Sequence, residues 1–152
     1  MRISYVILLL FVLFGCALSA DQERILSEAQ RAYVDARNGA DVLKYVGYTH
    51  PSVIAHYRNQ ADSSFQKKFD LSKDSLTIQD GTIRLIKQKG TSIHVNYLFK
   101  TVEKGSFGVF GDDVHIIAIS EDNGKSWFFL DEKDYRNEQI IALKNQLIEP
   151  NE

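Results

Sequence analysis

The feature that most constrains the fold is a change in the spacing of apolar residues near position 75 of the 152-residue chain. Before this point, apolar residues recur at steps of three and four, which gives a helix one buried face. After it, apolar and polar residues alternate, as in a strand that buries one face. The sequence therefore predicts an α+β protein in which helices precede an antiparallel sheet.

The helical spacing fills segments 21–37, 41–46 and 52–69. The last of these is compatible with one helix or with two. Asn38-Gly39 is expected to end the first helix with a left-handed cap. His50 precedes Pro51, where the chain avoids helical backbone angles, so we expect its ring nitrogens to cap the helix that follows.

Strand-like runs follow at 76–78, 83–85, 93–99, 114–120 and 127–130. The first two are separated by Asp80-Gly81, which predicts a tight turn between them. Within 93–99 the odd positions are apolar and predict one buried face. A closing helix is expected over 134–148, with an apolar set of Ile140, Ile141, Leu143, Leu147 and Ile148.

The N-terminus has the features of a secretory signal peptide. Arg2 is followed by a nearly continuous apolar run, Ile3 to Phe14, and then by small residues up to Ala20. The run is shorter than the ~20 residues that a membrane-spanning helix needs. We therefore expect residues 1–20 to be a signal peptide and residues 21–152 to form a single domain.

Two cleavage sites compete in this segment. Leu13-Phe14-Gly15-Cys16 resembles a bacterial lipobox, in which the cysteine is lipidated and becomes the new N-terminus, although Phe14 departs from the usual pattern. The alternative is ordinary cleavage after Ser19 or Ala20. Lipidation at Cys16 would hold the domain at a membrane surface through its acyl chains, without spanning the bilayer. The expected location is the bacterial cell envelope or, with ordinary cleavage, the exterior.

Composition and motifs exclude several kinds of activity. Without Arg2 the chain is mildly acidic and has no basic stripe, so nucleic-acid binding is disfavoured. Cys16 is the single cysteine, which leaves no disulfide within the chain. The four histidines lack the spacing of a metal site, and no phosphate loop or nucleophile elbow occurs, so neither a metal nor a cofactor is predicted.

Residues 120–127, SEDNGKSW, fit the Asp-box pattern found in sialidases and other sugar-active propellers. The chain is too short, and its first half too helical, for the repeated four-stranded blades of a propeller. The Asp122 carboxylate is expected to bind backbone N–H groups of its own turn, with Gly124 supplying an unusual backbone angle and Trp127 covering the turn. The motif predicts a clasp between two strands and gives no support for a glycan enzyme.

The order of these elements resembles the nuclear transport factor-like superfamily, also called cystatin-like or SnoaL-like. The similarity is carried by Asn38-Gly39-Ala40-Asp41, by Thr49-His50-Pro51 with Val53-Ile54, and by the stretch from Ser120 to Asp131. The resemblance implies a strongly curved antiparallel sheet that wraps the helices into a cone with a hollow. A long C-terminal helix is not a standard part of this cone. The superfamily includes isomerases, dehydratases, ligand carriers and dimerisation modules, so the resemblance leaves the function open.

Enzymes of this superfamily use an Asp or His base beside a tyrosine donor in the hollow, which gives the candidate site residues here. His94, His115 and Tyr33 are the catalytic candidates. The candidate ligand-binding residues are Tyr33, His94, Asn96, Tyr97 and His115. Asp35 is the nearest candidate carboxylate, but its helical position places it with the solvated residues. The alternative is that His94, Asn96 and His115 line the exposed side of a sheet.

Three functions are compatible with these observations. The first is an exported, lipid-anchored module that binds a small apolar ligand or an envelope protein, as a homodimer through the outer sheet face. The second is an isomerase or dehydratase that uses His94 or His115 as a base with a tyrosine donor. The third is a structural envelope lipoprotein with a filled cone.

Overall fold

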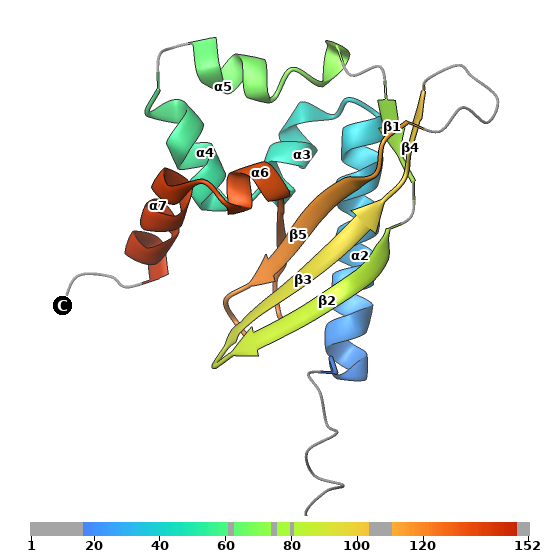
Figure 1. Cartoon of the computed structure of the whole chain (residues 1–152), viewed down its shortest axis with the longest axis vertical. Helices are drawn as coiled ribbons and strands as arrows, with labels where there is room; N and C mark the ends of the chain where they lie inside the picture. The colour runs from blue at the N-terminus through green and yellow to red at the C-terminus, as the bar shows by residue number, and fades with distance from the viewer. Residues whose placement is uncertain (1–16, 61–62, 74–75, 80, 104–110, 149–152) are drawn as a thin grey trace, which may run out of the picture.

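A computed structural model describes residues 17–60, 63–73, 76–79, 81–103 and 111–148 (Figure 1). The structure is mixed α+β, with helices and a curved antiparallel sheet, which confirms the predicted fold class at this level. Residues 1–16 of the predicted signal peptide, Cys16 included, lie outside the described part. Within that part, no helix has the length and apolar character needed to cross a membrane.

The first half of the chain supplies the helices that the periodicity predicts. They are α2 (Ala20–Asn38), α3 (Val42–Tyr48), α4 (Pro51–Arg58) and α5 (Ser63–Lys68), followed by a single 3-10 turn, η2 (Leu71–Lys73). Ser19 caps α2: its hydroxyl accepts a hydrogen bond from the Gln22 N–H, and the Gln22 side chain accepts one from the Ser19 N–H. This reciprocal pair is a capping box and satisfies donors that a helix start leaves open.

The C-terminal end of α2 differs from the prediction by one residue. Gly39 keeps a right-handed φ of −82°, and the left-handed residue is Ala40, with φ 56°. The Asp41 N–H bonds the Ala36 carbonyl at 2.9 Å, the long hydrogen bond of a Schellman motif, which puts the left-handed position one residue later. The Asn38 side chain instead bonds both backbone groups of Ile78 and so joins α2 to the sheet region.

The strands form two separate antiparallel sheets. Their bounds are β1 (Leu76–Ile78), β2 (Thr82–Lys89), β3 (Ser92–Phe99), β4 (Thr101–Glu103), β5 (Val114–Ser120) and β6 (Phe128–Asp131). The main sheet has the order β2-β3-β5-β6, and β1 pairs only with β4. Helix α2 runs behind the main sheet, whereas the later helices lie beyond β5 (Figure 1).

The predicted hairpin between 76–78 and 83–85 is therefore wrong in its pairing. The Gln79 N–H bonds the Lys100 carbonyl at 2.9 Å, which continues the β1–β4 ladder instead of closing a turn. Gly81 then crosses the ring of Phe99 so closely that an added Cβ would lie 2.7 Å from it. The missing side chain of Gly81 lets the chain pass over the core into β2. Asp80 lies outside the described residues.

The predicted buried face of residues 93–99 is confirmed. Ile93, Val95, Tyr97 and Phe99 are all buried, and the alternate positions are only partly covered. Aromatic rings from helices and sheet fill the space on this side. Tyr33 of α2 stacks on Phe129 of β6 at 4.6 Å between ring centroids, and Tyr45 of α3 lies 5.2 Å from Tyr33. These rings form an aromatic layer within the hydrophobic core, which aliphatic side chains complete.

The Asp-box forms the predicted clasp between β5 and β6. The Asp122 carboxylate accepts hydrogen bonds from the N–H groups of Lys125 and Ser126, at 3.0 and 2.9 Å, and from two serine hydroxyls. Gly124 has φ 84°, and the buried Trp127 indole donates to the Gly124 carbonyl. The Gln22 side chain of α2 also donates to the Asn123 carbonyl at 2.9 Å, so the clasp holds the start of the first helix.

The single C-terminal helix expected over 134–148 is instead two helices, α6 (Glu132–Tyr135) and α7 (Glu138–Ile148). Asn137 separates them, because its side chain accepts hydrogen bonds from the N–H groups of Gln139 and Ile140 and starts α7. Of the predicted apolar set, Ile140 is buried and Ile141 is 41% exposed. The side chains of Leu147 and Ile148 lie outside the described part.

We predict that Asp122→Ala lowers the free energy of unfolding by about 2 kcal/mol, because it removes charge-assisted hydrogen bonds that hold the β5–β6 turn. Denaturant unfolding of the purified domain measures the change. Asp113→Ala is the matched control, an exposed aspartate just before β5, and should change stability by less than about 0.5 kcal/mol. Equal effects of the two substitutions would contradict the role of the clasp.

Candidate functional site

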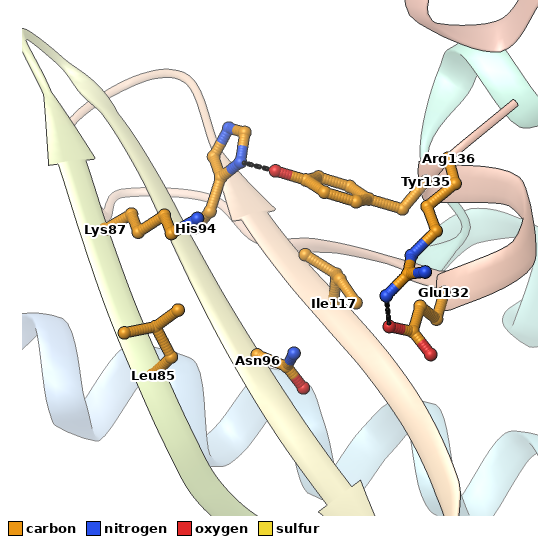
Figure 2. Close-up of a pocket in the computed structure, with 8 residues that line it drawn as sticks. All are labelled: Leu85, Lys87, His94, Asn96, Ile117, Glu132, Tyr135 and Arg136. Carbon is orange, nitrogen blue, oxygen red and sulfur yellow. Dashed lines mark hydrogen bonds and ion pairs between the residues drawn. The ribbon is translucent and has the colours of Figure 1, made fainter. Parts of the chain in front are cut away.

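The outer face of the main sheet, opposite the aromatic core, carries the polar residues of the strands. His94 and Asn96 of β3 alternate with the buried positions, and they pair with Lys87 and Leu85 of β2. Together with Ile117 of β5, these residues form the floor of a groove of about 170 Å³ (Figure 2). The remaining lining residues come from α6 and its C-cap: Glu132, Tyr135 and Arg136.

Tyr135 reaches from α6 across the groove to His94. Its hydroxyl lies 2.8 Å from His94 Nδ1, as Figure 2 shows, and the two rings meet edge to face. The other ring nitrogen, Nε2, lies 3.1 Å from the Ser92 hydroxyl and 3.4 Å from the Lys144 ammonium of α7. His94 is thus the point where β3, α6 and α7 meet.

A buried ion pair positions α6 and so positions Tyr135. The Asp134 carboxylate is 2% exposed and lies 2.6 Å from the Lys68 ammonium of α5. The Tyr57 hydroxyl of α4 donates to the same carboxylate at 3.1 Å, and Asp131 lies 3.0 Å from Lys68. Burial works to lower the pKa of Lys68, but Asp131 and Asp134 outweigh it and raise this pKa above its ordinary value. Lys68 therefore stays charged and clamps α6 to α4 and α5.

Lys144 lies between the groove and a second hollow. Its ammonium is 3.6 Å from the Glu121 carboxylate, beyond hydrogen-bond distance, and its side chain is 19% exposed. The second hollow, of about 190 Å³, lies between the sheet, α4 and α7. Its lining is mostly apolar: Ser52, Ile119, Leu130, Tyr135, Ile140, Ile141, Lys144 and Asn145. Tyr135 lines both hollows and separates the polar groove from the apolar one.

The charge state of His94 follows from its surroundings. Burial, followed by the nearby Lys144 ammonium, lowers the pKa of His94, so its ring is neutral at neutral pH. An ammonium only donates, so its contact with Nε2 requires a lone pair there and a proton on Nδ1. Nδ1–H then donates to the Tyr135 oxygen, and the Tyr135 O–H is left to donate elsewhere. Burial raises the pKa of Tyr135, which keeps this hydroxyl protonated.

The structure divides the predicted site residues between the two faces of the sheet. Tyr33 and Tyr97 are buried in the aromatic core, where the Tyr33 hydroxyl contacts that of Tyr45 at 3.4 Å. Burial and the neighbouring Tyr45 raise the pKa of Tyr33 well above its ordinary value. His94, Asn96 and His115 lie on the outer face. Tyr33 is therefore not brought together with the histidines.

Asn96 and His115 are neighbours on adjacent strands. His115 Nδ1 donates to the Asn96 side-chain oxygen at 3.3 Å, and both residues are half-buried. Asn96 lines the groove beside His94, whereas His115 does not. Asp35 lies on the exposed face of α2, away from the groove.

Sequence reasoning missed Tyr135, Lys144 and Glu121. Tyr135 and Lys144 fall in the segment that was predicted to be one closing helix, and Glu121 belongs to the Asp-box turn. The amphipathic pattern of that segment predicts a helix. It does not indicate which polar side chain contacts β3. Among the described residues, no group of three His, Cys, Asp or Glu side chains is placed to hold a metal ion.

His50 caps α4 as predicted, and its capping partner Ser52 lines the second hollow. Its Nδ1 accepts hydrogen bonds from the Ser52 N–H at 3.2 Å and from the Ser52 hydroxyl at 2.8 Å. Burial, followed by the Lys144 ammonium, lowers the pKa of His50 from 6.5 to about 4. Protonation would also place a hydrogen on the capping nitrogen.

We predict that acid weakens the fold through His50. A histidine whose pKa is lowered on folding binds more protons when unfolded, so stability is complete above pH 6.5 and is lost as the pH falls toward 4. The expected loss is about 3 kcal/mol. Urea unfolding between pH 7 and pH 4 measures it. His50→Asn keeps a capping oxygen but cannot titrate, so its slope should be shallower; an unchanged slope would contradict the assignment.

Comparison of the chain with protein-family models, with curated proteins and with solved structures finds no match in any of the three.

Proposed function

We propose that the protein is an exported, lipid-anchored domain of the nuclear transport factor-like cone type, and that its outer groove binds an anionic group of a small ligand or of an envelope partner. The first helix, α2, precedes a curved antiparallel sheet and packs against one of its faces, which supports the cone assignment. The added helices α6 and α7 support a site on the opposite face, because α6 builds one wall of the groove and α7 one wall of the second hollow.

The observation that carries the binding proposal is the environment of the Lys144 ammonium. Its side chain is four-fifths covered, but its contacts are long: 3.4 Å to His94 and 3.6 Å to Glu121. The ammonium is thus only loosely paired, by an ion pair with Glu121 beyond hydrogen-bond distance and by a long contact with a neutral ring, so it can donate to a closer acceptor. A ligand carboxylate between Lys144 and the free O–H of Tyr135 would satisfy both groups. The apolar hollow beside them suits an aliphatic or aromatic substituent on the same ligand.

The close pair of His94 and Tyr135 favours a second candidate, an isomerase or dehydratase. A neutral histidine is a usable base, and a protonated tyrosine is a usable donor. However, no acidic side chain contacts either ring nitrogen of His94; its contacts among the described residues are with Ser92, Tyr135 and Lys144. A base without an orienting carboxylate, in an open groove, supports recognition better than catalysis.

The N-terminal residues of the described chain support lipidation at Cys16 over ordinary cleavage. Leu18 is 8% exposed and belongs to the core, and Ser19 forms the capping box of α2. Cleavage after Ser19 or Ala20 would remove both contributions. Cleavage before Cys16 would keep them and leave the modified cysteine close to the start of the fold.

We predict that a chain starting at Asp21 is less stable than one starting at Ala17 by about 2–3 kcal/mol. The shorter chain loses two stabilising contributions, the burial of the Leu18 side chain and the capping of α2 by Ser19. Thermal and urea unfolding of the two chains measure the difference. A Leu18→Ala, Ser19→Ala variant of the longer chain should reproduce the shorter one. Equal stability of the two starting points would remove this support for cleavage before Cys16.

We predict that native mass spectrometry of protein extracted gently from its host envelope shows an acylated Cys16 and a retained small molecule or partner. Lys144→Met should lose the bound species, whereas Lys133→Met, an exposed lysine on α6, should keep it. Thermal unfolding confirms that both variants are folded. An unmodified chain starting near residue 20 would contradict anchoring. An acylated wild-type chain that carries nothing would contradict the binding proposal.

A further inference from the structure

The two edges of the main sheet differ sharply. At the β6 edge, Thr49 forms a bridge with Phe129, and the His50 N–H donates to the Phe129 carbonyl at 3.0 Å. At the opposite edge, β2 pairs with β3 alone, and no other described strand lies beside it. Figure 1 shows β2 on the side of the sheet away from α4, α6 and α7. Within the described residues, one edge is covered by the protein's own chain and the other is open.

The open edge is long and partly apolar. β2 has eight residues, and all of them except Ile86 are exposed. Ile83 is 44% exposed and Leu85 is 49% exposed. An open edge presents unpaired N–H and C=O groups that another strand can bond, and proteins usually shorten or cover such edges. No other described strand pairs with this long edge and its exposed apolar side chains.

The charges on β2 indicate which kind of added strand could pair with it. Arg84, Lys87 and Lys89 are all exposed, and Thr82–Lys89 contains no acidic residue. None of the three cations forms an ion pair with the rest of the described chain. Pairing of β2 with a second copy of itself would place these cations opposite one another, which is destabilising. An added strand with acidic side chains would instead neutralise them.

The open edge also borders the groove. Leu85 and Lys87 line the groove of about 170 Å³, and a shallow hollow of about 510 Å³ beside it is lined by Ile86–Lys89 with Ser92 and His94. Directly opposed side chains on paired strands lie ~5 Å apart. Lys87 and Lys89 share the face of His94, and Ile86 lies on the opposite face. An added strand that alternates acidic and apolar residues would thus place acidic side chains beside Lys87 and Lys89, at the groove mouth, and apolar ones beside Ile86.

We infer that β2 accepts an extended acidic segment of a partner protein, which adds to the main sheet as a further antiparallel or parallel strand. Backbone hydrogen bonds to β2 would supply affinity, and the acidic and apolar side chains would supply specificity. The inference rests on the proposed function, since it names the partner of a binding module. It uses residues of β2 that the anionic-group site at Lys144 and Tyr135 does not use.

The test uses a peptide of eight residues, the length of β2, that alternates valine and glutamate, with the full mature chain. Fluorescence anisotropy measures binding, and hydrogen exchange measures protection of individual amides. We expect binding together with slower exchange of β2 amides. A peptide that alternates valine and lysine should not bind. A valine–glutamate peptide with alternate backbone nitrogens methylated keeps the charge but loses donors, and should also not bind.

The charge-reversed variant Arg84→Glu, Lys89→Glu should weaken binding of the glutamate peptide at least ~10-fold and gain binding of the lysine peptide. Both positions are exposed, so the variant should fold. The inference is wrong if the glutamate peptide does not bind at about 1 mM, or if it binds without slowing amide exchange in β2. It is also wrong if β2 amides are already protected in a dimer of the protein without peptide. If the chain keeps its Lys144-dependent ligand in those cases, the proposed function stands and only the β2 inference fails.

Discussion

The position of α6 depends on one buried charge pair. Asp134 is 2% exposed, and its carboxylate is balanced by the Lys68 ammonium at 2.6 Å. Removing charges from water is unfavourable, so such a pair is stable only when both partners are present and hydrogen-bonded. Tyr57 supplies the additional donor. Tyr135 directly follows Asp134. The ion pair therefore also fixes the position of the α6 wall of the groove and of the Tyr135 hydroxyl that contacts His94.

The parts of the fold that depend on contacts between residues close together in the sequence could be predicted. Alternation from Ile93 to Phe99 gave the buried face of β3, because a strand turns successive side chains to opposite sides. The Asp-box clasp was predictable as well, since Asp122 and all of its partners lie within a few residues. The cap at His50 followed from its place before Pro51, where the chain has to start a new helix.

The site was not predictable in the same way, because its contacts join distant segments. His94 meets Tyr135 across 41 residues and Lys144 across 50. The apolar pattern of the C-terminal segment indicated helix but gave no reason to break it at Asn137, whose side chain starts α7. The alternation of apolar and polar residues in β3 also did not indicate which face of the sheet α2 covers. That choice placed Tyr33 in the core and left the histidines outside.

The link between the first helix and the Asp-box turn has a consequence for the order of folding. Gln22 bonds Asn123 across 101 residues, and Tyr33 stacks on Phe129. During synthesis α2 emerges first, but part of the surface it packs on, β6 and the Asp-box turn, emerges only with the last quarter of the chain. Contacts of such long sequence separation form slowly, since the loop must close before they are gained. We therefore expect α2 to complete its docking on the sheet only once β6 is available.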